Sequence, residues 1–291
     1  MTEDSNQFNS RNIILNAIKS PNDDRDWLIA NKLNIAVPTL LDYRYLLQPI
    51  RNQGSQGTCY AQSAACAKEW QENKDYGFNK YLSPQFFYNH RPNLYDEHNN
   101  NDYGMFGRDV MRLLSNIGIC TEDEYPYGKI ENKNEINVSV NESALKHKIK
   151  SYARIDTIDT LKLSLYKNGP CLIAFPIYNY SDQMWKKNNE DDELIGGHAM
   201  TVVGYTEDSF IIRNSWGKYW GERGYCYYKF KDWGVHWEIW SIVDDKTIII
   251  KPNIEPDIDI DLNENSTKKN NSCFTTIIIT LFYSLFKLFK K

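Results

Sequence analysis

The strongest indication of the fold is the run Ile212-Arg213-Asn214-Ser215-Trp216-Gly217-Lys218-Tyr219-Trp220-Gly221-Glu222-Arg223-Gly224-Tyr225. The β-rich run at residues 210–213 leads into it, so we expect Asn214 at the exit of a strand. An asparagine amide can hold a neighbouring ring in one orientation by hydrogen bonding. The stretch therefore predicts a β unit with an orienting amide at its edge.

Two upstream segments contribute other reactive groups. Cys59 follows Gln53-Gly54-Ser55-Gln56-Gly57-Thr58, and its glycines permit close approach of the backbone to a substrate. It also begins a run without Gly or Pro, residues 60–70, that predicts a helix whose dipole would lower the thiol pKa. His198 lies in Gly196-Gly197-His198-Ala199-Met200, at the entry to a predicted strand. Nucleophilic catalysis by cysteine needs such a thiol, an imidazole, a group that orients it and oxyanion donors.

Each of these residues alone has an ordinary structural interpretation. A cysteine is usually a small buried apolar side chain, and this interpretation holds for Cys66, Cys120, Cys171 and Cys226, which lie in apolar runs. A single histidine or asparagine in a turn is more often a structural hydrogen-bonding group. The functional interpretation depends on the combination.

The order of predicted elements indicates an α+β fold with a helical lobe followed by a β lobe. Helices are expected at residues 60–70 and 110–117, the second ended by Gly118. Strands are expected at residues 171–177, 199–205, 210–213, 225–230 and 239–243.

Together, the three segments resemble the papain and cathepsin family of cysteine peptidases, and they occur in that family's order. The resemblance covers residues 37–243 and implies a two-lobe fold with the active site in a cleft between the lobes. It implies that Cys59 is the nucleophile, that His198 carries the proton and that Asn214 orients the histidine. Gln53 and the backbone N–H of Cys59 would form the oxyanion hole, Trp216 would shield the histidine, and polypeptides would be the substrates.

The resemblance also identifies residues that would bind substrate: Gly104, Met105, Phe106, Ala174, Gly197, Ala199, Trp216 and Trp240. An aromatic and small-residue pocket with no acid at its base predicts a preference for apolar side chains over arginine. Gly104-Met105 stands where the family has two glycines, which leaves main-chain pairing with a substrate open at this point. Gln56 stands where the family usually has a disulfide cysteine, and Tyr60 replaces a tryptophan.

Composition indicates which kinds of partner are unexpected and which cellular compartment fits the chain. The net charge is −4 and basic residues form no block before the last few positions, so nucleic acid is not an expected partner. The six cysteines have no paired spacing, so we expect no disulfide, no metal and no cofactor. The polar, acidic N-terminus lacks the pattern of a secretory signal. These features favour a reducing, cytosol-like compartment or the interior of a particle.

Four regions are predicted along the chain of 291 residues. Residues 1–36 are an extension outside the main core, either a short inhibitory propeptide or a disordered arm. Residues 37–250 are the peptidase domain, and residues 251–272 a polar linker. Residues 273–291 are an apolar segment with terminal lysines, and residues 273–289 are a candidate C-terminal membrane anchor with the protease in the reducing compartment. An interfacial helix, or a soluble cytoplasmic protein with this segment docked, is the alternative.

Two other functions compete with an active protease. A papain-like binding module without activity would keep the fold but would usually lose one of the four catalytic groups, and all four are present here. A cysteine acyltransferase such as a transglutaminase uses a related triad, but its histidine motif is not expected to be followed by Asn-Ser-Trp-Gly. Endopeptidase activity is therefore the function that the sequence predicts.

Overall fold

The computed structural model describes residues 8–10, 12–29, 35–91, 104–130, 132–243 and 249–250. Two units are distinguished along the chain, residues 1–253 and 254–291, and every described residue belongs to the first. Cys273 and the candidate anchor at residues 273–289 therefore lie outside the described residues. None of the helices within the described residues has the length and hydropathy that a membrane span requires.

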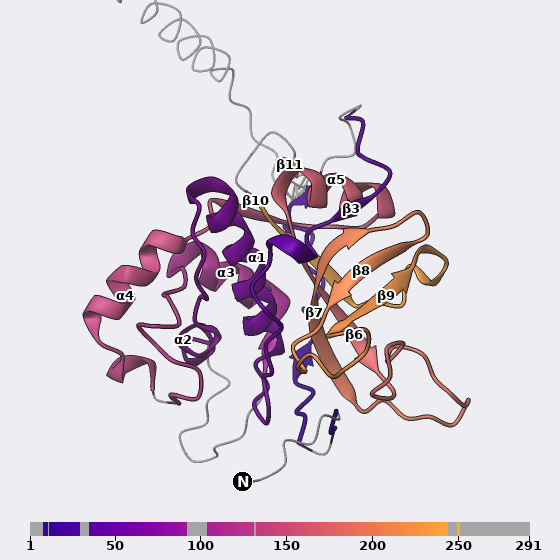
Figure 1. Ribbon diagram of the computed structural model, residues 1–291, viewed down its shortest axis with the longest axis horizontal. Coiled ribbons are helices and arrows are strands. Elements are labelled where there is room, and N and C mark those ends of the chain that lie inside the picture. The colour runs from indigo at the N-terminus through magenta and orange to yellow at the C-terminus, as the bar shows by residue number, and fades with distance from the viewer. Residues whose placement is uncertain are drawn as a thin grey trace, which may run out of the picture. The chain divides into compact units, whose positions relative to one another are not determined.

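Four of the helices gather on one side of this unit, as Figure 1 shows. They are α1 (Cys59–Tyr76), α2 (Pro84–Asn89), α3 (Gly107–Asn116) and α4 (Val138–Ala144), accompanied by 3-10 turns at η1 (Arg44–Leu46), η2 (Lys133–Glu135) and η3 (Leu145–His147). Helix α1 is buried from its first residue to Glu72. Alanines at positions 61, 64, 65 and 67 allow this close packing, because they carry little volume. The prediction of a helix at residues 60–70 is confirmed, and the helix continues for six further residues until Gly77, whose φ is 67°.

The strands form one sheet of nine and a separate pair. The strands are β1 (Ala17–Ile18), β2 (Leu28–Ile29), β3 (Leu41–Asp42), β4 (Met105–Phe106), β5 (Ser151–Arg154), β6 (Cys171–Ile177), β7 (Gly196–Tyr205), β8 (Ser209–Arg213), β9 (Tyr225–Lys229), β10 (Glu238–Val243) and β11 (Ile249–Ile250). The nine-stranded sheet has the order β11-β2-β5-β10-β6-β7-β8-β9, with β3 paired to β7 beside this path, and β1 pairs with β4. All five strands predicted from residue 171 onward are present, with bounds that differ by at most three residues.

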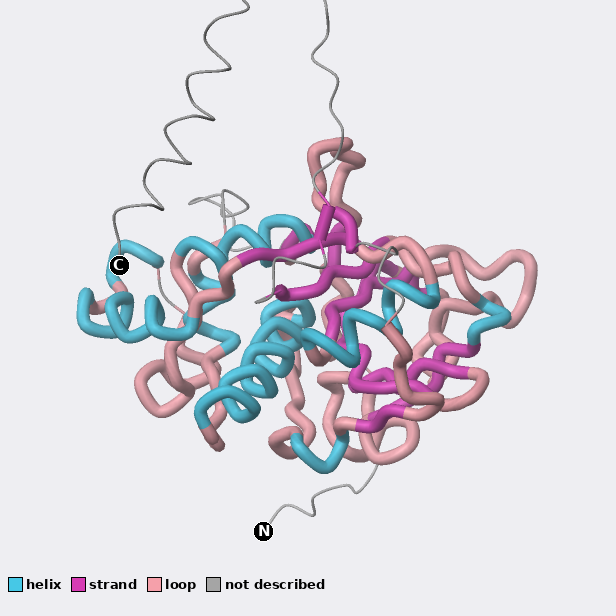
Figure 2. The backbone as a smooth tube through the Cα atoms, turned by 90° about the horizontal axis from the view of Figure 1, so that it is seen from above, coloured by secondary structure: helices cyan, strands magenta, loops and turns pink. Residues whose placement is uncertain are grey.

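The central strands of the sheet are buried on both faces. In β6, Leu172 and Ala174 belong to the cluster that α1 and α3 cover, whereas Ile173 and Phe175 belong to a second cluster on the opposite face. Because successive side chains of a strand point to opposite faces, one strand contributes to two cores. Helix α5 (Ile158–Asn168) adds its leucines to the second cluster, and η4 (Phe230–Asp232) adds Phe230. Figure 2 shows α1 running alongside these strands. The predicted α+β fold with two lobes is thus confirmed.

The N-terminal extension departs from its prediction as a segment outside the main core. Ala17 is 5% exposed and lies in the helical-lobe cluster, and Ile29 is 3% exposed and lies in the β-lobe cluster. Strand β2 is hydrogen-bonded between β5 and β11 within the nine-stranded sheet. Strands β1 and β2 of the extension have two residues each, so their pairing comes from tertiary contacts that local periodicity does not reveal.

The five described cysteines, Cys59, Cys66, Cys120, Cys171 and Cys226, are buried and form no disulfide with one another. Burial raises the pKa of Cys171 to about 12. The described part of the chain therefore relies on packing, without covalent cross-links among these cysteines.

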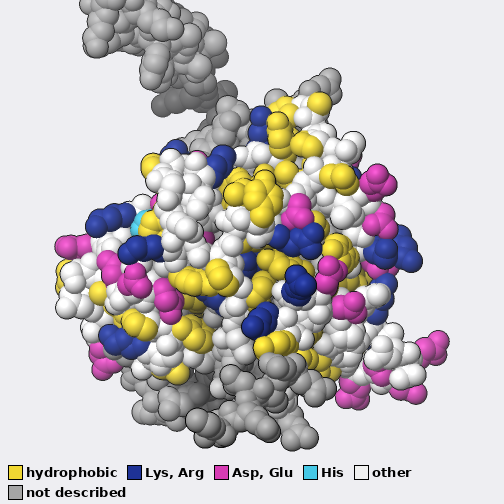
Figure 3. Space-filling view, viewed as in Figure 1, with side chains coloured by type: hydrophobic (Ala, Val, Ile, Leu, Met, Phe, Trp, Pro, Cys, Tyr) yellow, Lys and Arg dark blue, Asp and Glu magenta, His cyan; other side chains and the backbone are white. Residues whose placement is uncertain are grey.

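On the face drawn in Figure 3, acidic and basic side chains are interspersed rather than gathered by sign.

Candidate active site

A hydrogen-bonded histidine and asparagine lie at the ends of two adjacent strands. His198 is in β7, two residues after its start, and Asn214 follows the last residue of β8. Because β7 and β8 are paired antiparallel, the start of one meets the end of the other. The Nε2 atom of His198 is 2.7 Å from Oδ1 of Asn214, and both side chains are buried.

The neighbouring backbone fixes which way the asparagine amide points. The backbone N–H of Ser215 donates a hydrogen bond of 2.7 Å to the same Oδ1 atom. A backbone N–H can only donate, so this atom of Asn214 is the oxygen, and Nε2 of His198 must carry a proton. In the neutral ring, the other nitrogen, Nδ1, is then an acceptor. Within the described residues, Nδ1 of His198 has no hydrogen-bond partner.

Aromatic rings cover this pair and remove it from water. The indole of Trp216 stacks on the His198 imidazole with ring centroids 4.3 Å apart and 29° between the planes. Phe8 stacks on Trp216 in turn, at 5.9 Å. Burial lowers the pKa of His198 to about 4, and the hydrogen bond with Asn214 acts in the opposite direction. The ring is therefore held in its neutral form while it is covered.

Cys59 is the first residue of α1 and is completely buried. The N-cap residue Thr58 makes no side-chain cap to the helix, so the first N–H groups of α1 point toward the thiol end without a capping oxygen from that residue. Cys59 shares one buried cluster with Ala199, the residue after His198. The structure thus brings the start of α1 and the start of β7 into one packed region.

Gln53 lies in the loop before α1 and is tied to the loop that follows Asn214. The backbone N–H of Gln53 donates to the carbonyl of Ser215 at 2.8 Å, and the Ser215 hydroxyl donates to Oε1 of Gln53 at 2.6 Å. Its Nε2 therefore points away from Ser215, where it donates to the carbonyl of Gln56 at 3.0 Å and to that of Ile14 at 3.5 Å. Ser215 connects the two predicted catalytic segments, although the sequence analysis assigned it no role. Its position next to Asn214 was the available signal.

A segment of the N-terminal extension, residues 12–19, crosses this region between two stretches of backbone. We refer to it as the covering segment. On one side, β1 pairs parallel with β4, and Met105 donates its N–H to the carbonyl of Asn16 at 3.3 Å. On the other side, Asn16 forms a parallel bridge with Gly197. Main-chain pairing therefore occurs at Met105, and the missing second glycine does not prevent it.

The glycines on both sides leave room for this close approach. At Gly104, whose φ is +73°, an added Cβ would lie 1.6 Å from the carbonyl oxygen of Asn16. At Gly197, a Cβ would lie 2.1 Å from the carbonyl oxygen of Ala17. Any side chain at either position would displace the covering segment.

The predicted substrate-binding residues lie along the covering segment. The Ala17 side chain belongs to the same buried cluster as four of them, which are Met105, Ala174, Ala199 and Trp240. Phe106 is in register with Ile18 in the β1–β4 pair. Trp216 contacts Phe8, upstream of the covering segment. The predicted substrate-binding residues therefore lie close to the covering segment or to Phe8 just before it.

An acid lies beside one of the residues from which a pocket without an acid was predicted. Glu238 is 2% exposed, and its Oε2 accepts a hydrogen bond of 3.0 Å from Nε1 of Trp240. Glu238 lies two positions before Trp240 and on the same side of β10, because side chains alternate along a strand. Within the described residues, no group of three His, Cys, Asp or Glu side chains is arranged to hold a metal ion.

Comparison with known proteins identifies a family for this chain. A family model described as papain family cysteine protease matches residues 37–238. An uncharacterized peptidase C1-like protein of Acanthamoeba polyphaga mimivirus is 29% identical over 241 residues, which are 74% of this chain and 78% of that protein. Cathepsin K of Mus musculus is 34% identical over 207 residues, and the alignment spans 65% of this chain and 59% of cathepsin K.

Solved structures show the same fold. Xylellain, a cysteine protease from Xylella fastidiosa, superposes with a TM-score of 0.69 at 26% identity, covering 80% of this chain and 96% of xylellain. A digestive procathepsin L 3 of Tenebrio molitor gives a TM-score of 0.60 at 19% identity, covering 75% of this chain and 73% of that chain. This chain belongs to the papain family of cysteine peptidases.

Proposed function

We propose that the protein is an endopeptidase that works through a thiolate–imidazolium pair of Cys59 and His198. The observation that carries the proposal is the hydrogen bond from Nε2 of His198 to Asn214, which leaves Nδ1 as the acceptor. In this mechanism Nδ1 takes the proton of the Cys59 thiol, and the sulfur attacks the carbonyl carbon of the scissile peptide bond. Asn214 keeps the ring in the productive tautomer, and Trp216 excludes water from the bond between them.

The tetrahedral intermediate requires donors for its oxyanion. We assign this role to Nε2 of Gln53 and the backbone N–H of Cys59. The hydroxyl of Ser215 supports the assignment, because its bond to Oε1 turns the donor end of the Gln53 amide the other way. Collapse of the intermediate transfers the proton from His198 to the leaving amine and yields a thioester. Water, activated by His198, then hydrolyses the thioester and restores Cys59.

We further propose that the covering segment, residues 12–19, inhibits the enzyme. Two contacts support this role. The carbonyl of Ile14 accepts a hydrogen bond from Nε2 of Gln53, the proposed oxyanion donor. The carbonyl of Asn16 occupies the backbone N–H of Met105, a proposed substrate-binding group. A substrate can use these donors only after the covering segment has left.

A third proposal concerns the C-terminus. Residues 273–286 carry no charged side chain, and Lys287 can extend toward lipid headgroups, which lengthens the usable span to Phe289. We propose that this segment attaches the protein to a membrane, with the peptidase in a reducing, cytosol-like compartment or a particle interior. The polar linker at residues 251–272 gives the segment freedom to do so.

Introducing a charge into the covering segment should activate the enzyme. Ala17→Asp places a carboxylate where 5% of the side chain is exposed, so the segment is expected to leave and hydrate it. Peptidase activity, and the rate at which the epoxide E-64 labels Cys59, should both rise at least tenfold. Asn12→Asp, which adds the same charge at an exposed residue of the segment, is the matched control and should behave as wild type. Equal rates in all three proteins would contradict inhibition by this segment.

The catalytic assignments predict graded losses in the Ala17→Asp background. Cys59→Ala should abolish turnover and His198→Ala should nearly abolish it. Gln53→Ala should lower kcat by about two to three orders of magnitude, as loss of one oxyanion donor does. Gln56→Ala retains the carbonyl that Gln53 contacts and should keep most activity. Turnover in Cys59→Ala, measured on a fluorogenic peptide, would rule out the mechanism.

Acid should destabilise the covered form through His198. Its pKa falls from 6.5 to about 4 on burial, so between these values the unfolded chain binds a proton that the folded ring does not. Stability is therefore highest above pH 6.5 and falls as the pH drops to 4, by roughly 3 kcal/mol for this group. His198→Asn should reduce the difference in Tm between pH 7.5 and pH 4.5. His236, whose pKa burial also lowers to about 4, accounts for a separate part, which His236→Asn removes. An unchanged pH dependence in His198→Asn would refute this contribution.

Membrane attachment predicts a difference in fractionation. Full-length protein should remain with membranes after carbonate extraction, whereas a variant ending at Asn271 should be recovered in the supernatant with its peptidase activity intact. A full-length protein that stays in the supernatant without detergent would disprove the attachment.

A further inference from the structure

The ten residues that follow the covering segment make contacts of another kind. We call residues 20–29 the N-terminal arm. Ile29 is part of the β-lobe core, and strand β2 lies between β5 and β11 in the sheet. The carbonyl of Trp27 accepts a hydrogen bond of 2.7 Å from the backbone N–H of Arg154. Unlike the covering segment, the end of the arm is thus built into the peptidase domain.

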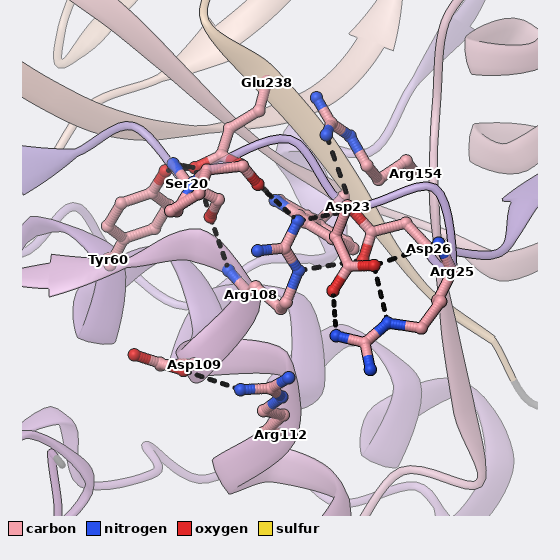
Figure 4. Close-up of polar contacts among 12 residues, drawn as sticks. Ser20, Asp23, Arg25, Asp26, Tyr60, Arg108, Asp109, Arg112, Arg154 and Glu238 are labelled. Atoms are coloured by element: carbon pink, nitrogen blue, oxygen red, sulfur yellow. Dashed lines mark hydrogen bonds and ion pairs between the residues drawn. The ribbon is translucent and has the colours of Figure 1, made fainter.

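Asp26 connects the arm to both lobes. Its carboxylate accepts two hydrogen bonds from Arg108 on α3, at 2.8 Å from Nε and 2.6 Å from Nη2. It also lies 3.4 Å from Nη1 of Arg154 on β5. The side chains of Asp26 and Arg108 are 8% and 10% exposed. Figure 4 shows Asp26 between the two arginines. Removing this carboxylate would leave two guanidinium groups largely buried without their shared partner.

Ser20 connects the arm to Glu238 and to α3. The backbone N–H and the hydroxyl of Ser20 donate to Oε1 of Glu238, at 3.2 Å and 3.1 Å. The Ser20 hydroxyl also accepts the backbone N–H of Arg108 at 3.0 Å, near the start of α3, where the N-cap residue Phe106 provides no side-chain cap. Ser20 therefore acts as a cap for α3 from another part of the chain.

The carboxylate of Glu238 accepts four hydrogen bonds, three at Oε1 and one at Oε2. Oε1 accepts a third hydrogen bond, of 2.6 Å, from the hydroxyl of Tyr60, the residue beside Cys59. Oε2 accepts one from Trp240, a predicted pocket residue. Gly107 lets the carboxylate lie against the main chain, since an added Cβ would be 2.7 Å from Oε1. Two of the three donors to Oε1 thus come from Ser20, as Figure 4 shows.

The hydrogen-bond donors around Glu238 determine whether its carboxylate can bind a cationic side chain of a substrate. A buried carboxylate needs hydrogen-bond donors, and one that has them has little remaining capacity to bind a cation. With Ser20 in place, the predicted substrate-binding residues in this region that remain to meet a substrate, Ala174, Ala199 and Trp240, are apolar. Without Ser20, Oε1 would keep only the Tyr60 hydroxyl and would attract a lysine or arginine side chain of a substrate.

We propose that the N-terminal arm, residues 20–29, stays docked in the active enzyme, and that Ser20 makes the enzyme selective for apolar side chains by keeping Glu238 occupied. This inference rests on the proposed peptidase function. It also requires that the covering segment, residues 12–19, leaves while residues 20–29 stay in place. It assigns to residues 20–29 a part in the working enzyme, in contrast to the expectation of a single extension over residues 1–36.

The selectivity is measured in the full chain carrying Ala17→Asp. The quantity is the ratio of kcat/KM for an Arg-Arg reporter to that for a Leu-Arg reporter. Ser20→Ala removes the hydroxyl donor to Oε1 of Glu238 and keeps the backbone N–H. It should raise this ratio about tenfold, as expected when a buried charged group loses one hydrogen bond. Ser20→Thr retains the hydroxyl and should restore the wild-type ratio. A merely structural defect would lower both rates together. An unchanged ratio in Ser20→Ala would overturn the role of Ser20.

Docking of the arm is measured separately by thermal unfolding of the full chain. Asp26→Asn should lower Tm by several degrees. Asp23→Asn is the matched control, because Asp23 pairs with Arg25, whose side chain is 73% exposed, and such surface pairs contribute little. With Ala17→Asp present, Asp26→Asn should still lower Tm by the same amount. No additional loss in that background would show that the arm leaves with the covering segment and would overturn the proposal. If instead no variant turns over peptide or reacts with E-64, the peptidase function fails, while the Tm comparison still tests the arm.

Discussion

The burial of β6, β7 and β10 on both faces is the constraint on which the rest of the molecule depends. Leu172 and Ala174 face the helices while Ile173 and Phe175 face the second core, so a shift of one residue in register would exchange the two sets. The same alternation places His198 on the side of Trp216 and Ala199 on the side of Cys59. Packing along the strand therefore sets the face of the sheet on which the imidazole lies, and the contacts of the ring with Asn214 and Trp216 hold it there.

The parts of the fold that the sequence predicts well are those with local signals. The Gly-free run after Cys59 predicted α1, and apolar β-rich runs predicted β6 to β10, because helix and strand periodicity are properties of neighbouring residues. The pairing of His198 with Asn214 followed from a resemblance in motif order, and the structure places these two side chains in contact. The catalytic roles of these residues remain predictions for the mutants to test.

The parts that the sequence did not reveal depend on contacts between distant residues. Strands β1 and β2 have two residues each, too few for any periodic pattern, and they are defined by partners more than 80 positions away. Glu238 was overlooked for a related reason. Two of its donor residues, Ser20 and Tyr60, lie far from it in sequence, and the third, Trp240, is two positions away. No local pattern therefore marks the acid as a neighbour of the predicted substrate-binding residues.

The covering segment and the arm are continuous in the chain, and this continuity affects how fast the covering segment returns to its docking site. A segment tethered a few residues from its docking point meets the site at an effective concentration on the order of millimolar, whatever the concentration of the protein. A free peptide at micromolar levels would compete poorly even if its intrinsic affinity were equal. Dilution cannot relieve such occupancy, and neither can a moderate excess of substrate. The rate at which the enzyme becomes available is then set by events within its own chain.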